Sequence, residues 1–152
     1  MLEVGAKAPR FSVKATDGRT LTNEALSGKP YVLYFFPKSF TTGCTIETKQ
    51  FADAYPALQA LGVEVVGVSS DAHETQCEFA KSTGASFPMV GDTRGELLRS
   101  FDVRWPILGV AKRVTYVVDG EGVVRGAFRH ELDVKRHLED VRACVGRIAP
   151  RA

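Results

Sequence analysis

The sequence has few of the features that mark secreted, membrane-spanning or metal-binding proteins. Its three cysteines are too few, and odd in number, for the disulfide scaffold of a small secreted protein. No two of them have the Cys-x-x-Cys spacing of a zinc site or a dithiol oxidoreductase, so we expect no metal and no other cofactor. No apolar run approaches the ~20 residues that cross a bilayer.

The amino terminus and the charge balance exclude further classes. The segment MLEVGAKAPRF lacks the ~7–15-residue apolar stretch of a signal peptide, so we expect a cytoplasmic protein. The formal net charge is +2 and both signs are mixed along the chain, which gives no electrostatic basis for nucleic-acid or membrane binding. With 152 residues, of which 44% are hydrophobic, we expect one domain, residues 1–152, with a sizeable core.

The most informative stretch runs from Tyr31 to Lys49. Residues 31–36, YVLYFF, are rich in aromatic and β-branched side chains, which predicts a short strand buried on both faces. Pro37 ends this strand, a polar loop follows, and a helical pattern starts at about residue 42. Cys44 therefore lies at a helix start, where free backbone N–H groups and the helix dipole stabilise a thiolate. A thiolate at the end of a central strand is a candidate nucleophile.

Apolar periodicity and turn residues divide the rest of the chain into strands and helices. Asp17-Gly18 between two extended segments predicts an amino-terminal β-hairpin. Asp71 followed by Glu74 predicts the capped start of a helix, and Pro56 predicts a kink or a restart in the helix before it. Further strands are expected at 63–68, 87–90, 113–118 and 123–128, and further helices at 22–28, 71–84, 93–101 and from 133.

This order of elements is a β-hairpin, then a βαβα segment, then a closing β-hairpin and helix. A strand–helix–strand unit gives parallel strands with a right-handed connection, and the closing hairpin adds antiparallel strands. The sequence therefore predicts an α/β fold of the thioredoxin-like type, with a mixed central sheet flanked by helices and an N-terminal β-hairpin.

The residues around Cys44 also resemble a known family. Pro-x-x-x-Thr-x-x-Cys after an apolar strand, here Pro37, Thr41 and Cys44, is similar to the active-site loop of the peroxiredoxins. The flanking Phe-Phe-Pro-Lys and Gly-Cys-Thr-x-Glu, which ends at Glu47, resemble the bacterioferritin-comigratory or Q-type subfamily. The likeness covers nearly the whole chain and continues through three later segments, Gly67-Val68-Ser69, Phe87-Pro88 and residues 113–119.

This resemblance implies roles for four residues. Cys44 is the peroxidatic cysteine, Pro37 and Thr41 are its motif partners, and Arg113 is the arginine of the site. In such a reaction a thiolate attacks one peroxide oxygen, displaces the other, and becomes a sulfenic acid that a second thiol resolves. The helix start, the Thr41 hydroxyl and the Arg113 guanidinium are suitable donors for the developing negative charge.

The second thiol is where this sequence departs from the subfamily that it resembles. Many members carry a resolving cysteine at the position of Lys49 in this chain. Another group carries it in the helix after the next strand, where this chain offers Cys77, although the register puts that cysteine nearer Ala80. Cys77 is therefore the candidate resolving residue. Resolution by Cys144, or by an external thiol in a single-cysteine mechanism, stays open.

The resemblance thus implies a thiol peroxidase that reduces hydrogen peroxide and organic hydroperoxides and is recycled by thioredoxin or a similar thiol reductant. We expect a monomer or a weak dimer. The rivals are a thiol–disulfide oxidoreductase on the same fold and a non-enzymatic thiol redox sensor or binding module. We interpret Glu47 as a helix surface carboxylate without a catalytic role, and His73, His130 and His137 as surface residues.

Overall fold

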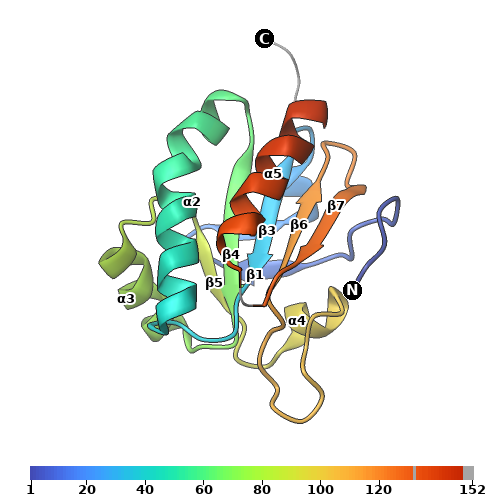
Figure 1. The fold of residues 1–152 in the computed structure, drawn as a ribbon. Coiled ribbons are helices and arrows are strands. Elements are labelled where there is room, and N and C mark those ends of the chain that lie inside the picture. Colours follow the sequence, from blue (N-terminus) through green and yellow to red (C-terminus); the bar gives the residue numbers. More distant parts are fainter. Residues whose placement is uncertain (132, 149–152) are drawn as a thin grey trace.

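The computed structural model describes residues 1–131 and 133–148, and its elements are drawn in Figure 1. A central sheet has the strand order β5-β4-β3-β6-β7. Its strands are β3 (Tyr31–Phe35), β4 (Glu64–Ser69), β5 (Met89–Gly91), β6 (Val114–Val118) and β7 (Val124–Arg129). Parallel and antiparallel pairs both occur in it. The predicted mixed sheet is confirmed.

Strand β3 lies at the centre of the sheet, and all of its residues are buried. It runs parallel to β4, with Leu33 opposite Val66, and antiparallel to β6, with Leu33 opposite Tyr116. Antiparallel pairing puts the start of β6 beside the end of β3, so that Phe35 lies opposite Val114. Residues that precede β6 therefore reach the same edge of the sheet as residues that follow β3.

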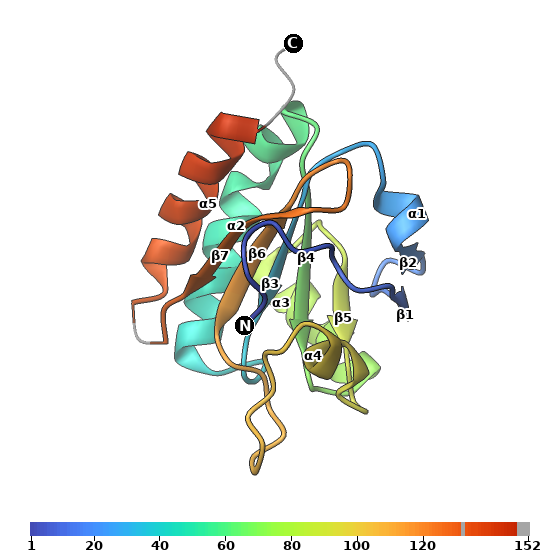
Figure 2. The same ribbon diagram turned by 90° about the vertical axis from the view of Figure 1, so that its right-hand side faces the viewer.

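Each face of the sheet carries its own core. One face is covered by α2 (Thr42–Ala60), α3 (His73–Thr83) and α5 (Lys135–Ile148). The other face is covered by α1 (Asn23–Leu26), α4 (Glu96–Ser100) and the amino-terminal segment, as Figure 2 shows. Successive residues of β3 point to opposite faces: Tyr34 stacks on Phe51 of α2, and Phe35 packs against Phe101 after α4. The predicted helices on both faces are confirmed.

The amino-terminal hairpin forms as predicted. Strands β1 (Ser12–Lys14) and β2 (Thr20–Thr22) pair antiparallel around Asp17 and Gly18. Gly18 has a φ of 89°, a conformation that glycine adopts without steric cost. Thr22 then caps α1, because its hydroxyl oxygen accepts the Ala25 N–H at 3.0 Å.

The carboxyl-terminal end of α3 follows the sequence signal, whereas α2 does not restart at its proline. Helix α3 ends at Gly84, which has a φ of 71° as the carboxyl-terminal cap. Helix α2 continues through Pro56 to Ala60, so the helix does not restart there. Pro56 is exposed, so the carbonyl that lacks its N–H partner lies on the side of the helix that water reaches.

Asp71 does not cap α3 as predicted. The residue before the helix is Ala72, and no side chain caps that end. The Asp71 carboxylate instead accepts hydrogen bonds from the Ser39 N–H at 2.8 Å and the Ser69 hydroxyl at 2.6 Å. Asp71 therefore fixes the loop that follows β3, because a long-range bond to that loop replaces the local bond of a helix cap.

Candidate active site

Cys44 lies in the first turn of α2 and is fully buried. The helix begins after Thr41, whose carbonyl oxygen accepts the Thr45 N–H at 2.9 Å. The N–H groups of Gly43 and Cys44 lie among those that have no intrahelical partner, and the positive end of the helix dipole is here. This is the lower edge of the sheet in Figure 1, where β3 ends and α2 begins.

Arg113 reaches the Cys44 sulfur from the start of β6. Its Nη1 lies 3.4 Å from Cys44 Sγ and 3.1 Å from Glu47 Oε1. Glu131 holds the base of the side chain: its carbonyl oxygen accepts the Arg113 Nε–H, and its carboxylate accepts the Arg113 backbone N–H, both at 3.2 Å. The structure thus brings Arg113 and Cys44 together, and the register of β3 and β6 is the reason.

Gly43 lets the guanidinium come this close to the helix. A Cβ atom at this position would lie 3.3 Å from Arg113 Nη2 and 3.7 Å from Val134 Cγ1. The first of these distances is tighter than nine in ten real Cβ contacts, so a side chain here would require Arg113 to shift by a few tenths of an ångström. The sequence showed this glycine next to the cysteine, but only the folded chain shows which group its small size admits.

Pro37 and Thr41, the two motif partners, lie in the loop between β3 and α2. Pro37 directly follows the buried Phe36 and is half-buried. Thr41 is exposed, and its hydroxyl donates to the Lys38 carbonyl oxygen at 2.7 Å rather than capping α2. Ser39 anchors the loop, because its hydroxyl donates to a side-chain oxygen of α3 at 2.7 Å.

Glu47 is fully buried, so its interpretation as a surface carboxylate was wrong. It lies one helical turn after Cys44, on the face of α2 that packs against the sheet and α5. Oε1 accepts a hydrogen bond from Arg113, whereas Oε2 has no hydrogen-bond partner. Burial raises the pKa of Glu47 to about 8, although the positive charge of Arg113 opposes this shift.

His137 of α5 is also fully buried, and its interpretation as a surface residue was wrong as well. Its Nδ1 lies 2.8 Å from Thr115 Oγ1, and its Nε2 lies 2.9 Å from the His130 carbonyl oxygen. The same Nε2 is 3.7 Å from Glu47 Oε2. Burial lowers the pKa of His137 to about 4, so the ring is neutral at physiological pH.

Helical spacing held a signal for both buried groups. Glu47 follows Cys44 by three residues and so shares its helix face. His137 precedes the buried Val141 by four residues, which places it on the apolar stripe of the last helix. The sequence interpretation missed the burial of these two residues because charged and titratable side chains are seldom fully buried.

The other two cysteines lie outside this cluster, and all three are free thiols. Cys77 is half-buried in α3, with its sulfur 3.5 Å from His73 Nε2, and lines a hollow with Thr16 and Asp17. Cys144 is fully buried in α5 within the core. The structure therefore does not pair either of them with Cys44.

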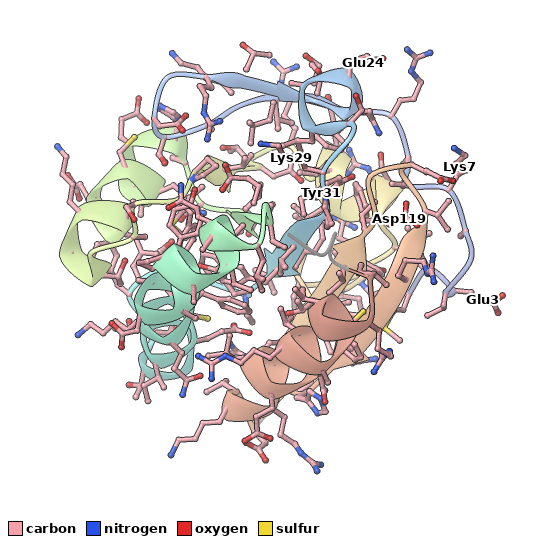
Figure 3. All side chains as sticks on the ribbon, turned by 90° about the horizontal axis from the view of Figure 1, so that it is seen from above. Glu3, Lys7, Glu24, Lys29, Tyr31 and Asp119 are labelled. Atoms are coloured by element: carbon pink, nitrogen blue, oxygen red, sulfur yellow. The ribbon has the colours of Figure 1, made fainter. Side chains whose placement is uncertain are left out.

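A second hollow lies at the opposite end of the sheet. Lys7, Glu24, Tyr31 and Asp119 line it, and Figure 3 looks onto this end. Tyr31 is the first residue of β3, whereas the loop to Cys44 follows the last, so the length of the strand separates the hollow from the thiol. No cysteine lines this hollow.

Neither a metal cluster nor a membrane span is present among the described residues. In residues 1–131 and 133–148, no group of three or more His, Cys, Asp or Glu side chains is placed to hold a metal ion. Over the same residues, no helix combines the length and apolarity needed to cross a membrane.

Comparison with known proteins assigns the family. The sequence model of the protein family described as the AhpC/TSA family matches residues 4–127 of this chain. The chain belongs to the AhpC/TSA family. The chloroplastic peroxiredoxin Q of Populus jackii is 33% identical over 137 residues, which are 90% of this chain and 64% of that protein. This AhpC/TSA chain thus spans less than two thirds of the length of that relative.

A second relative and a solved structure agree with this assignment. Peroxiredoxin Bcp of Bacillus subtilis (strain 168) is 32% identical over 147 residues, 91% of this chain and 92% of that protein. The bacterioferritin comigratory protein of Xanthomonas campestris superposes with a TM-score of 0.84 at 30% identity, over 97% of both chains. The resemblance to the bacterioferritin-comigratory and Q-type peroxiredoxins is confirmed, and so is the thioredoxin-like fold.

The pKa of Glu47 makes a prediction about stability. Between pH 4.5, its ordinary value, and about 8, the native protein holds a proton that the unfolded chain has lost. The free energy of unfolding contributed by this group therefore falls as pH rises through this range, by up to about 4 kcal/mol. We expect the free energy of unfolding of the wild type to fall by this amount relative to that of Glu47→Gln, as measured by urea unfolding at pH values from 4.5 to 8.5.

The exposed Glu78 of α3 supplies the matched control. Glu78→Gln removes the same charge from a helix surface, so its unfolding free energy should run parallel to that of wild type. If the curve of Glu47→Gln also ran parallel, Glu47 would not hold a proton in the native protein. His137 titrates in both proteins, so its contribution cancels in the comparison.

Proposed function

We propose that this AhpC/TSA protein is a thiol peroxidase in which Cys44 reduces hydrogen peroxide and organic hydroperoxides. The observation that carries the proposal is the 3.4 Å contact between Arg113 Nη1 and the Cys44 sulfur at a helix start. A positive side chain and a helix dipole act together on one buried sulfur and stabilise its thiolate. In support, both curated relatives are named peroxiredoxins, and the Xanthomonas campestris protein is described by its alkyl peroxide reduction activity.

In the chemical step the Cys44 thiolate attacks the nearer peroxide oxygen. The S–O bond forms as the O–O bond breaks, the sulfur is oxidised to a sulfenic acid, and the far oxygen leaves as hydroxide or alkoxide. Arg113 and the free N–H groups at the start of α2 stabilise the negative charge as it moves to the leaving oxygen. Thr41 orients the peroxide, and Pro37 shields the sulfur from water.

Peroxide reaches the sulfur by movement of the loop that covers it. Cys44 is fully buried, but four of the five residues at 38–42 are exposed. Phe40 in this loop has a φ of 66°, a left-handed conformation that is costly for a bulky residue. An opened loop releases this strain, whereas Ser39 keeps its anchor to Asp71.

Cys77 then resolves the sulfenic acid. Its sulfur attacks the Cys44 sulfur, a disulfide forms, and the hydroxyl leaves as water. Cys44 lies in the first turn of α2 and Cys77 in the second turn of α3, and these helices follow the paired parallel strands β3 and β4. Because Cys44 contacts Arg113 and Cys77 contacts His73 in the reduced protein, both helix starts open locally to form the bond.

Thioredoxin or a similar thiol reductant returns both cysteines to the thiol form. The cycle runs in one domain, residues 1–152, as a monomer or weak dimer in the cytoplasm. A single-cysteine mechanism with an external thiol is the second candidate, because the two thiols are apart in the reduced protein. A redox sensor would be oxidised at Cys44 without turnover, and a thiol–disulfide oxidoreductase would reduce insulin.

The nucleophile is tested by Cys44→Ser. We expect peroxide consumption with thioredoxin, thioredoxin reductase and NADPH to fall to the background rate, because a serine hydroxyl is not ionised near neutral pH. Cys144→Ser is the matched control, since burial raises the pKa of the Cys144 thiol and keeps it protonated. Near-wild-type turnover in Cys44→Ser would end the peroxidase proposal.

The resolving thiol is tested by oxidising the protein with one equivalent of peroxide. We expect non-reducing peptide mapping to find a Cys44–Cys77 disulfide, and Cys77→Ser to stop turnover with thioredoxin while Cys44 is still oxidised. A free Cys77 after oxidation, or normal turnover of Cys77→Ser, would contradict this role. In that case Cys144 or an external thiol resolves Cys44.

A further inference from the structure

Two acidic groups compete for one guanidinium nitrogen in this site. Arg113 Nη1 lies 3.4 Å from Cys44 Sγ and 3.1 Å from Glu47 Oε1. Cys44 and Glu47 are both 0% exposed, and Arg113 is 8% exposed. With both acids ionised, the site would hold two negative charges against one positive charge without water, which is costly. One of the two acids therefore keeps its proton.

The carboxyl group is the better place for that proton. Oε2 of Glu47 has no hydrogen-bond partner, so an ionised carboxylate would leave half of its charge buried and unpaired. The charged and titratable groups that face Glu47 are Cys44 in α2, Arg113 before β6, Glu131, Tyr34 of β3 and His137 of α5. Of these, only Arg113 donates a hydrogen bond to Glu47. The sulfur is the better place for a negative charge, because the guanidinium and the free N–H groups of the helix start lie beside it.

His137 closes the other side of Glu47 to proton transfer. The His130 carbonyl oxygen can only accept, so His137 Nε2 carries a hydrogen and donates it there at 2.9 Å. Nδ1 then accepts the Thr115 hydroxyl at 2.8 Å. Both ring nitrogens are occupied and the ring is neutral, so His137 has no free site for a proton from Glu47. Any proton that Glu47 releases goes toward the Arg113 and Cys44 side.

We propose that Glu47 stores the proton that the leaving oxygen takes up when Cys44 is oxidised. This inference rests on the peroxidase function proposed above. The thiolate and the protonated Glu47 react with ROOH to give the sulfenic acid, the Glu47 carboxylate and ROH. The S–O bond forms, the O–O bond breaks, sulfur is oxidised and the peroxide is reduced. The charge of the buried site is the same before and after the step.

The exchange keeps one anion opposite Arg113 throughout. Before the step the partner of the guanidinium is the thiolate, and afterwards it is the Glu47 carboxylate. Glu47 therefore positions Arg113 and supplies a proton to the leaving oxygen. Its ionisation depends on the oxidation state of Cys44. A purely structural ion pair would hold Glu47 ionised in both states.

Infrared difference spectra of the whole protein, recorded before and after one equivalent of hydrogen peroxide, test this directly. We expect wild type to lose a protonated-carboxyl band and gain a carboxylate band on oxidation. Glu47→Gln should lack both changes, and the surface control Glu78→Gln should retain them. If Cys44 is oxidised while the carboxyl bands stay unchanged, the proton store is wrong although the peroxidase function stands. If Cys44 is not oxidised by peroxide, the proposed function itself fails.

The pH dependence of the oxidation rate gives a second readout that does not need the infrared bands. The step is followed by the fluorescence of the single tryptophan, Trp105, whose ring centroid lies 5.2 Å from Nζ of Lys112, the residue before Arg113. We expect the wild-type rate to fall on the alkaline side, above about pH 8, as Glu47 loses its proton. The rate of Glu47→Gln should stay level there. If Glu47→Gln does not fold, wild type alone decides: a rate that stays level above pH 8 overturns the proposal.

Discussion

A single guanidinium nitrogen, Nη1 of Arg113, lies between the sulfur of Cys44 and a carboxyl oxygen of Glu47. All three side chains are out of contact with bulk water or nearly so, and charges in such a place interact strongly with each other. Neighbouring residues hold the guanidinium in this position. Gly43 leaves room for the guanidinium, and Glu131 holds its base.

The fold supplies these groups from separate segments of the chain. Cys44 and Glu47 come from one face of α2, Arg113 from the residue before β6, and His137 from α5. Antiparallel pairing of β3 with β6 brings the first two segments to one edge of the sheet. Helix α5 then packs across the same face of the sheet as α2 and seals the carboxyl group from water. The site is therefore a product of sheet register and not of local sequence alone.

The sequence predicted what depends on local patterns. Continuous apolar character located β3, the Asp17-Gly18 turn located the hairpin, and the motif around Cys44 located the thiol. It failed where a long-range partner overrides a local preference. Asp71 has the position of a helix cap, but the loop after β3 offers it an N–H. Glu47 and His137 resemble surface residues until the fold supplies Arg113, Thr115 and the His130 carbonyl as partners.

The claim that Arg113 stabilises the Cys44 thiolate is tested most directly by Arg113→Ala. The thiolate absorbance of the reduced protein should appear at higher pH than in wild type. The rate of oxidation by peroxide at neutral pH should fall at least roughly tenfold, as expected for loss of one close opposite charge. Arg125→Ala, which removes an exposed β7 arginine paired with Asp119, should change neither quantity. An unchanged thiolate titration together with an unchanged peroxide rate in Arg113→Ala would contradict the account.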